Sequence, residues 1–182
     1  MKNRLSILIL LLSITLLTTI KLSAQDKNSA LEYNDKMIAI QTSVDDALAK
    51  FVDALDAFDP DLIAKEKKNA LQTIKKANKD IAAMGKFDGK DDYIKEMKIF
   101  MKMYKEITSK DLSEIMNLII KKGEDFSETD WDTYDSYFES ALNKYDSAFD
   151  RFNKFQSDFA SKWGFTIQNN EEDYYEEENY DE

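Results

Sequence analysis

The side chains that could carry chemistry are mostly carboxylates, because the chain contains no histidine and no cysteine. Two groups of acids follow helical spacing: Asp45, Asp46, Asp53 and Asp56, and then Asp132, Asp135, Glu139, Asp146 and Asp150. General acid–base catalysis would need one carboxyl group with a raised pKa in a dry cleft. Nothing in either pattern indicates such a cleft, so we interpret both groups as solvated helix faces.

Metal and nucleophile sites of the common kinds lack their usual ligands here. Met97, Met101 and Met103 offer soft thioethers that suit Cu(I), but Met103 points away from Met101 on a helix, which favours core packing. A ferritin-like di-metal site needs histidine, and a haem pocket would have only methionine or tyrosine as iron ligands. A calcium loop aligned on Gly89 places lysine and methionine at ligand positions, and no Ser-x-x-Lys motif occurs. We therefore predict no enzyme activity and no catalytic, cofactor-binding or metal-binding residues.

The net charge of the chain is −11. An acidic surface repels phosphate backbones, so we predict that the protein binds neither nucleic acid nor anionic membranes. We expect an unidentified protein or cell-envelope partner, and a basic partner is one option.

The first residues have the pattern of a secretory signal peptide. Lys2 and Arg4 precede an apolar stretch over residues 5–20, and Leu22-Ser23-Ala24 leads into polar sequence. We predict a signal peptide over residues 1–24 and export to the periplasm or the cell surface. The alternative is an uncleaved signal anchor, because the apolar stretch could just cross a thin bilayer. After cleavage, no stable membrane span would remain.

Helix-breaking residues divide the rest of the chain into four segments of similar length. The only proline is Pro60, and the four glycines are Gly85, Gly89, Gly123 and Gly164. Between them, apolar residues recur at spacings of three and four. The pattern predicts helices over residues 31–58, 60–84, 91–122 and 127–164. The expected fold is all-α, an antiparallel up-down four-helix bundle over residues 25–168.

The fourth segment carries a mostly aromatic stripe. Its members are Trp131, Tyr134, Phe138, Ala141, Tyr145, Ala148, Phe152, Phe155, Phe159 and Trp163. Aromatic side chains at helical spacing bury large areas against partner helices, so we interpret the stripe as core. The alternative is a surface that lines a cavity for an apolar ligand.

The last residues, 169–182, contain eight carboxylates and three tyrosines. Such a segment buries too little apolar area to fold, so we expect a disordered acidic tail. It could keep the protein soluble, dock on a basic partner or bind divalent cations weakly.

Several short motifs spread over residues 33–170 resemble one known family. They are Tyr33-Asn34-Asp35 with Gln41, Phe87-x-Gly89, Tyr104-Lys105-Glu106, Lys122-Gly123-Glu124, Glu128-x-Asp130 and Phe159-Ala160-x-Lys162-x-x-Phe165-Thr166-Ile167. The set resembles a family of small exported bacterial surface proteins whose biochemical role is unassigned. The resemblance implies export and surface display, and it supplies no catalytic residues. The chain lacks the cysteine that would make it a lipoprotein.

Together these patterns predict an exported, non-catalytic helical-bundle protein with an interaction or structural role. The alternative is a ligand- or metal-binding module that uses the bundle interior or the acidic tail.

Overall fold

The computed structural model describes residues 24–123 and 125–167. Its helices are α2 (Ala24–Asp56), α3 (Pro60–Ala83), α4 (Asp92–Ser109), α5 (Asp111–Lys122) and α6 (Glu128–Trp163). Within these residues the only strand-like pairing is an isolated bridge between Phe87 and Lys90. The expected all-α fold of four helical segments is confirmed, with α4 and α5 together forming the third. The expected leader up to residue 23 and the acidic tail lie outside the described residues.

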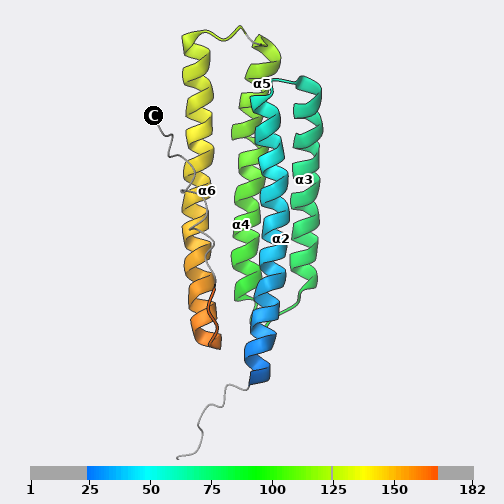
Figure 1. Cartoon of the computed structure of the whole chain (residues 1–182), viewed down its shortest axis with the longest axis vertical. Coiled ribbons are helices and arrows are strands. Elements are labelled where there is room, and N and C mark those ends of the chain that lie inside the picture. Colours follow the sequence, from blue (N-terminus) through cyan, green and yellow to red (C-terminus); the bar gives the residue numbers. More distant parts are fainter. Residues whose placement is uncertain (1–23, 124, 168–182) are drawn as a thin grey trace, which may run out of the picture.

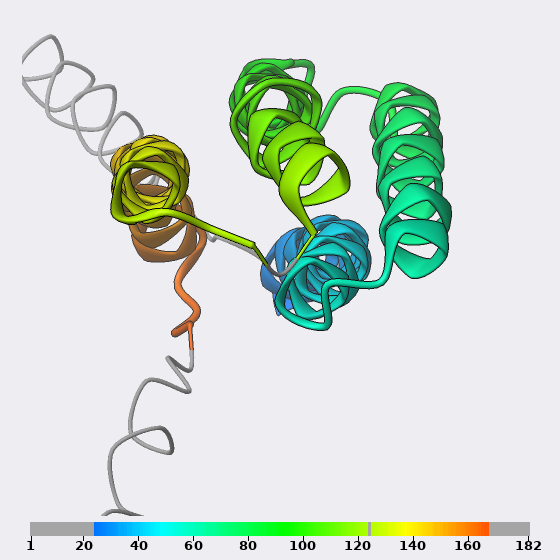
Figure 2. The same ribbon diagram turned by 90° about the horizontal axis from the view of Figure 1, so that it is seen from above.

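The helices lie side by side along one long axis, and the chain reverses direction at each connection between segments (Figure 1). Seen from above, α2, α3 and the α4–α5 segment form a close group, while α6 stands to one side of it (Figure 2). α3 lies on the far side of the group from α6. None of the described helices is long and apolar enough to cross a membrane.

Local side-chain and backbone interactions fix several of the segment ends. The Asp59 side chain accepts hydrogen bonds from the first free amides of α3, and Pro60 opens that helix. Ser127 and Asp130 form a reciprocal capping box at the start of α6. Hydrogen bonds from Ser127, with help from Lys122, hold the pKa of Asp130 down at about 2. Gly164 ends α6 in the left-handed conformation, at φ 70° and ψ 32°.

The predicted continuous helix over residues 91–122 is wrong, because the chain breaks at Lys110 between α4 and α5. The Thr108 hydroxyl donates to the Tyr104 carbonyl at 2.8 Å, and the Ser113 hydroxyl donates to the Thr108 carbonyl at 2.8 Å. Side-chain hydrogen bonds of this kind compete with the backbone ladder and bend helices. Asp91 is the N-cap residue of α4, but its side chain makes no capping hydrogen bond and pairs with Lys95 instead.

The first helix begins at Ala24, seven residues before the predicted start at Leu31. Ala30 explains the extension, because it is fully buried in a small cluster with Ala160, Trp163 and Phe165. Phe165 follows the end of α6 and packs over the end of the bundle, where it is 9% exposed. The early part of α2 is therefore covered by the end of α6, a contact that no local pattern reveals.

The aromatic stripe of α6 is buried only in part. Phe152 and Trp163 are buried, but Trp131 is 45% exposed, and most of the other aromatic members are half-buried. The interpretation of the stripe as core holds for its buried and half-buried members, which belong to the core clusters or pack against them, and is wrong for Trp131 near the start of α6. By contrast, Met97 and Met101 are fully buried core residues of α4.

Candidate functional site

An apolar groove runs between α2 and α6 and has a volume of about 400 Å³. We call it the α2–α6 groove. Its lining consists of Asp45, Leu48, Ala49, Val52, Asp53, Ile107, Leu112, Phe138, Ala141, Leu142 and Tyr145. Leu142 is 48% exposed and is one of five exposed large apolar side chains among the described residues. The groove thus presents apolar area to solvent along the middle of the bundle.

Asp45 lies at the edge of this groove in a partly buried position. Burial raises the pKa of the Asp45 carboxyl, although hydrogen bonds from Tyr104 and Gln41 favour its charged form. The ring of Tyr145 lies 6.1 Å from that of Tyr104, and burial beside the Asp45 carboxylate raises the pKa of Tyr145 to about 12. The groove therefore combines an apolar floor with a carboxylate that lacks full hydration.

The interpretation of the two acidic runs as solvated faces holds for every member except Asp45. Asp46, Asp53 and Asp56 are exposed on α2, and Asp132, Asp135, Glu139, Asp146 and Asp150 are exposed on α6. Asp45 follows buried Val44 and lies three residues before Leu48, so it sits on the boundary of the apolar stripe. This position at the boundary of the apolar stripe could have indicated from the sequence that Asp45 is partly buried.

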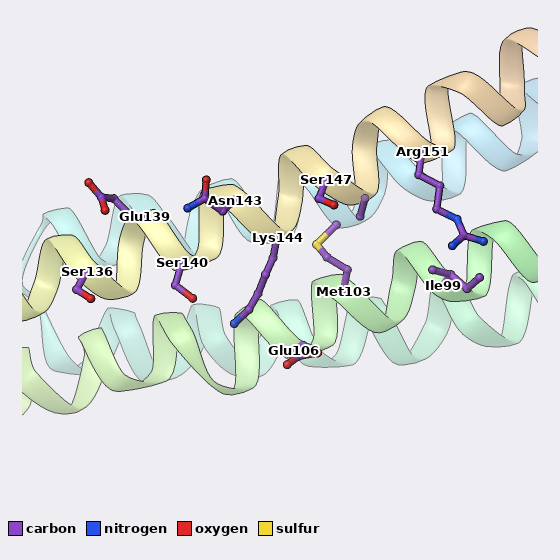
Figure 3. A pocket seen from close by; sticks show the side chains of 11 residues that line it. Ile99, Met103, Glu106, Ser136, Glu139, Ser140, Asn143, Lys144, Ser147 and Arg151 are labelled. Carbon is purple, nitrogen blue, oxygen red and sulfur yellow. The ribbon is translucent and has the colours of Figure 1, made fainter.

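On its other side α6 faces α4 across a polar surface with an open volume of about 740 Å³ (Figure 3). We call it the α4–α6 face. α6 contributes Ser136, Glu139, Ser140, Asn143, Lys144, Ser147, Ala148 and Arg151, and α4 contributes Ile99, Met103 and Glu106. Three of its four charged side chains are already paired: Lys144 with Asp111, Arg151 with Glu96, and Glu106 with Lys110. These ion pairs join helices, and they leave few charged groups to bind a ligand.

Asp111 is the anchor of that face. Its carboxylate is 5% exposed, and it accepts two hydrogen bonds from Lys144, at 2.7 and 2.8 Å, and one from Ser140 at 2.9 Å. A buried carboxylate costs free energy unless it is paired and hydrogen-bonded, as this one is. The three side chains fasten the start of α5 to the middle of α6.

The end of the bundle where α2 begins and α6 ends contains a buried polar chain. Gln156 donates to the Tyr93 hydroxyl at 3.0 Å, and Tyr93 donates to the Asn34 side chain at 2.7 Å. Tyr33 donates to the carbonyl of Gly85 at 2.9 Å. Burial raises the pKa of Tyr93, so its hydroxyl stays protonated and keeps donating. The network joins three helices and the α3–α4 connection.

Beside this network lies a smaller cavity of about 240 Å³, which we call the end pocket. Its lining consists of Phe87, Asp88, Lys90, Asp92, Tyr93, Phe155, Asp158, Phe159, Lys162 and Trp163. This pocket was not predicted from the sequence. Phe87 lies between Gly85 and Gly89 in the α3–α4 connection, and an aromatic residue in a glycine-rich turn was the available signal.

Comparison with family models, with curated protein sequences and with solved structures finds no match to this chain. The resemblance to exported surface proteins stays a prediction. The motif residues that carry it have visible structural roles, since Tyr33, Asn34, Phe87 and Phe165 pack or hydrogen-bond at the same end of the bundle.

Proposed function

We propose that the protein is an exported, non-catalytic binding protein whose α2–α6 groove takes a basic, apolar segment of a partner protein. The observation that carries the proposal is the groove itself, with nine apolar or aromatic side chains and two aspartates among its eleven lining residues. An amphipathic helix that inserts its apolar side chains into such a groove is a common recognition mode.

The charge of the groove supports a basic occupant. Asp45 and Asp53 line it, and no lysine or arginine does so among the described residues. A partner lysine or arginine placed near Asp45 would replace the hydration that the carboxylate has lost, and this would lower its pKa. A second copy of this chain fits poorly, because the net charge of −11 makes two copies repel each other.

The proposal also states that the protein has no catalytic activity and that it is exported. The sequence has no histidine or cysteine, which are the side chains best suited to proton transfer and nucleophilic attack near neutral pH. Export rests on the basic, apolar start of the chain with its small-residue exit, and display at a surface rests on the family resemblance.

A pair of synthetic helical peptides tests the groove. Both carry leucines at helical spacing; one has lysines on its polar face and the other has glutamates. We expect the lysine peptide to bind and the glutamate peptide to bind far more weakly. Leu142→Ser should weaken binding by at least about fivefold, as expected for loss of a central apolar contact. Ile99→Ser is the matched control, because Ile99 is similarly exposed, at 41%, but lies on the α4–α6 face.

Three outcomes would overturn the proposal. Equal binding of the two peptides would remove the argument from charge. Equal loss of binding in Leu142→Ser and Ile99→Ser would show that the contact is not specific to the groove. A dimer seen by sedimentation that Leu142→Ser abolishes would identify a second copy as the occupant.

Comparing the full chain with the chain from Gln25 onward would show whether the leader competes for the groove.

A further inference from the structure

The end pocket is walled by aromatic rings that stand at steep angles to one another. The Phe87 ring lies 5.0 Å from Trp163 at 84° and 5.5 Å from Phe159 at 68°. The Tyr93 ring lies 5.0 Å from Phe159 at 82° and 5.1 Å from Phe155 at 86°. These edge-to-face contacts hold the rings in place beside the pocket.

Three carboxylates surround these rings. Asp88, Asp92 and Asp158 line the pocket together with Lys90 and Lys162. Asp88 is held in a tight turn in which the amide and carbonyl groups of Phe87 and Lys90 bond reciprocally, at 3.0 and 2.9 Å. Asp88 and Gly89 both have positive φ, at 50° and 73°, as a type I′ turn requires. The turn therefore fixes the backbone of Asp88 relative to the Phe87 ring.

The protein already places a cation of its own at this site. The Lys162 ammonium lies 4.7 Å from the centre of the Trp163 ring and 3.9 Å from a carboxylate oxygen of Asp88. Both separations are within the range of cation–π and ionic attraction. The Lys162 side chain is half-exposed, so it can move away into solvent.

We propose that the end pocket binds a small organic cation, a quaternary or alkylated ammonium. The aromatic side chains would contact the alkylated nitrogen, and Asp88 would balance its charge. Lys162 acts as an internal competitor that a ligand displaces from the Trp163 ring. This site is separate from the α2–α6 groove and does not depend on the function proposed for it.

Choline is the probe for this site, and its neutral carbon isostere, dimethylbutanol, is the matched control. The chain has two tryptophans, so their indole N–H signals report on two places at once in an NMR titration of the full chain. Choline should shift the Trp163 signal and leave that of Trp131, near the start of α6, unchanged. The isostere should bind more weakly by about 2- to 30-fold, the range expected for cation–π attraction.

Variants of the two flexible charged side chains sharpen the test. Lys162→Ala removes the competitor and keeps the aromatic walls, so it should tighten choline binding. Asp88→Asn should weaken it, while Lys105→Ala, an exposed lysine elsewhere on α4, should leave it unchanged. The proposal is overturned if choline leaves the Trp163 signal unmoved in both the parent and Lys162→Ala, or if the neutral isostere binds equally well.

Discussion

α6 meets its neighbours along two sides, and the two sides differ in chemistry. Toward α4 and α5 it is joined by the ion pairs of Lys144 with Asp111 and of Arg151 with Glu96. Toward α2 it makes one hydrogen bond between described side chains, from the Tyr134 hydroxyl to Asp56 at 3.1 Å, and otherwise lines an apolar groove. The ion pairs hold α6 against α4 and α5, whereas the groove toward α2 leaves apolar side chains exposed to solvent.

This difference shows how a single helix can be both held in place and available for binding. Directional ion pairs and a buried aromatic contact hold α6 on α4 and α5. The exposed part of the groove, such as the 48% exposed Leu142, can therefore serve recognition. The predicted changes in the free energy of unfolding decrease from the side of α6 that faces α4 and α5 to the side that faces α2.

The largest effect should come from Phe152, which is 2% exposed and stacks on Phe100 with ring centres 5.0 Å apart. Phe152→Ala should lower the free energy of unfolding by about 3 to 5 kcal/mol, because it leaves a cavity between α6 and α4. Urea unfolding followed by circular dichroism measures this. Phe138→Ala, in the half-buried lining of the groove, should cost clearly less. An equal cost at both positions would contradict the comparison.

Removing the cation beside buried Asp111 should have the next largest effect. Lys144→Met keeps the aliphatic stem but leaves the carboxylate without its cation, so unfolding should become easier by about 3 kcal/mol. The double variant with Asp111→Asn should recover much of that loss, because no buried charge then remains unpaired. A double variant as unstable as the single one would show that the pair does not fasten α6 as proposed.

Arg151→Gln should have a smaller effect. The guanidinium makes two hydrogen bonds of 2.8 Å with Glu96 and lowers its pKa, but 56% of the Arg151 side chain is exposed to solvent. Exposed pairs of this kind contribute less than about 1 kcal/mol. The loss should shrink further in high salt, which a second series of urea titrations would show. A loss that salt does not reduce would mean that Arg151 acts through packing.

In the α2–α6 groove, Asp45→Asn should slightly raise the free energy of unfolding at neutral pH. Burial holds the folded-state pKa of Asp45 above its ordinary value of 3.8, so the folded protein binds this proton more tightly than the unfolded chain does. The charged carboxylate therefore costs stability above the folded-state pKa, and that cost disappears below the ordinary value. The advantage of the variant should follow the same pH window in thermal unfolding, and an advantage that persists in acid would rule out this cause.

Local sequence patterns were enough to predict the helical segments, their breaks and several of their ends. Pro60, the glycines and the Ser127–Asp130 box act over a few residues, so their effect can be read without a fold. The break at Lys110 was not predicted, because serine and threonine hydroxyls have several possible partners along a helix. The groove and the end pocket were also missed, since each combines residues from helices far apart in the chain.

The sequence by itself determined the all-helical character of the described chain, its acidic charge and the lack of histidine and cysteine chemistry. Only the tertiary structure decided which members of the aromatic stripe are buried, because that depends on how closely α6 packs against its neighbours. It also decided that Asp45 differs from the other aspartates on its helix, since Tyr104 of α4 approaches it from another segment. Burial and hydrogen bonding depend on neighbours in space, and periodicity along one helix cannot specify them.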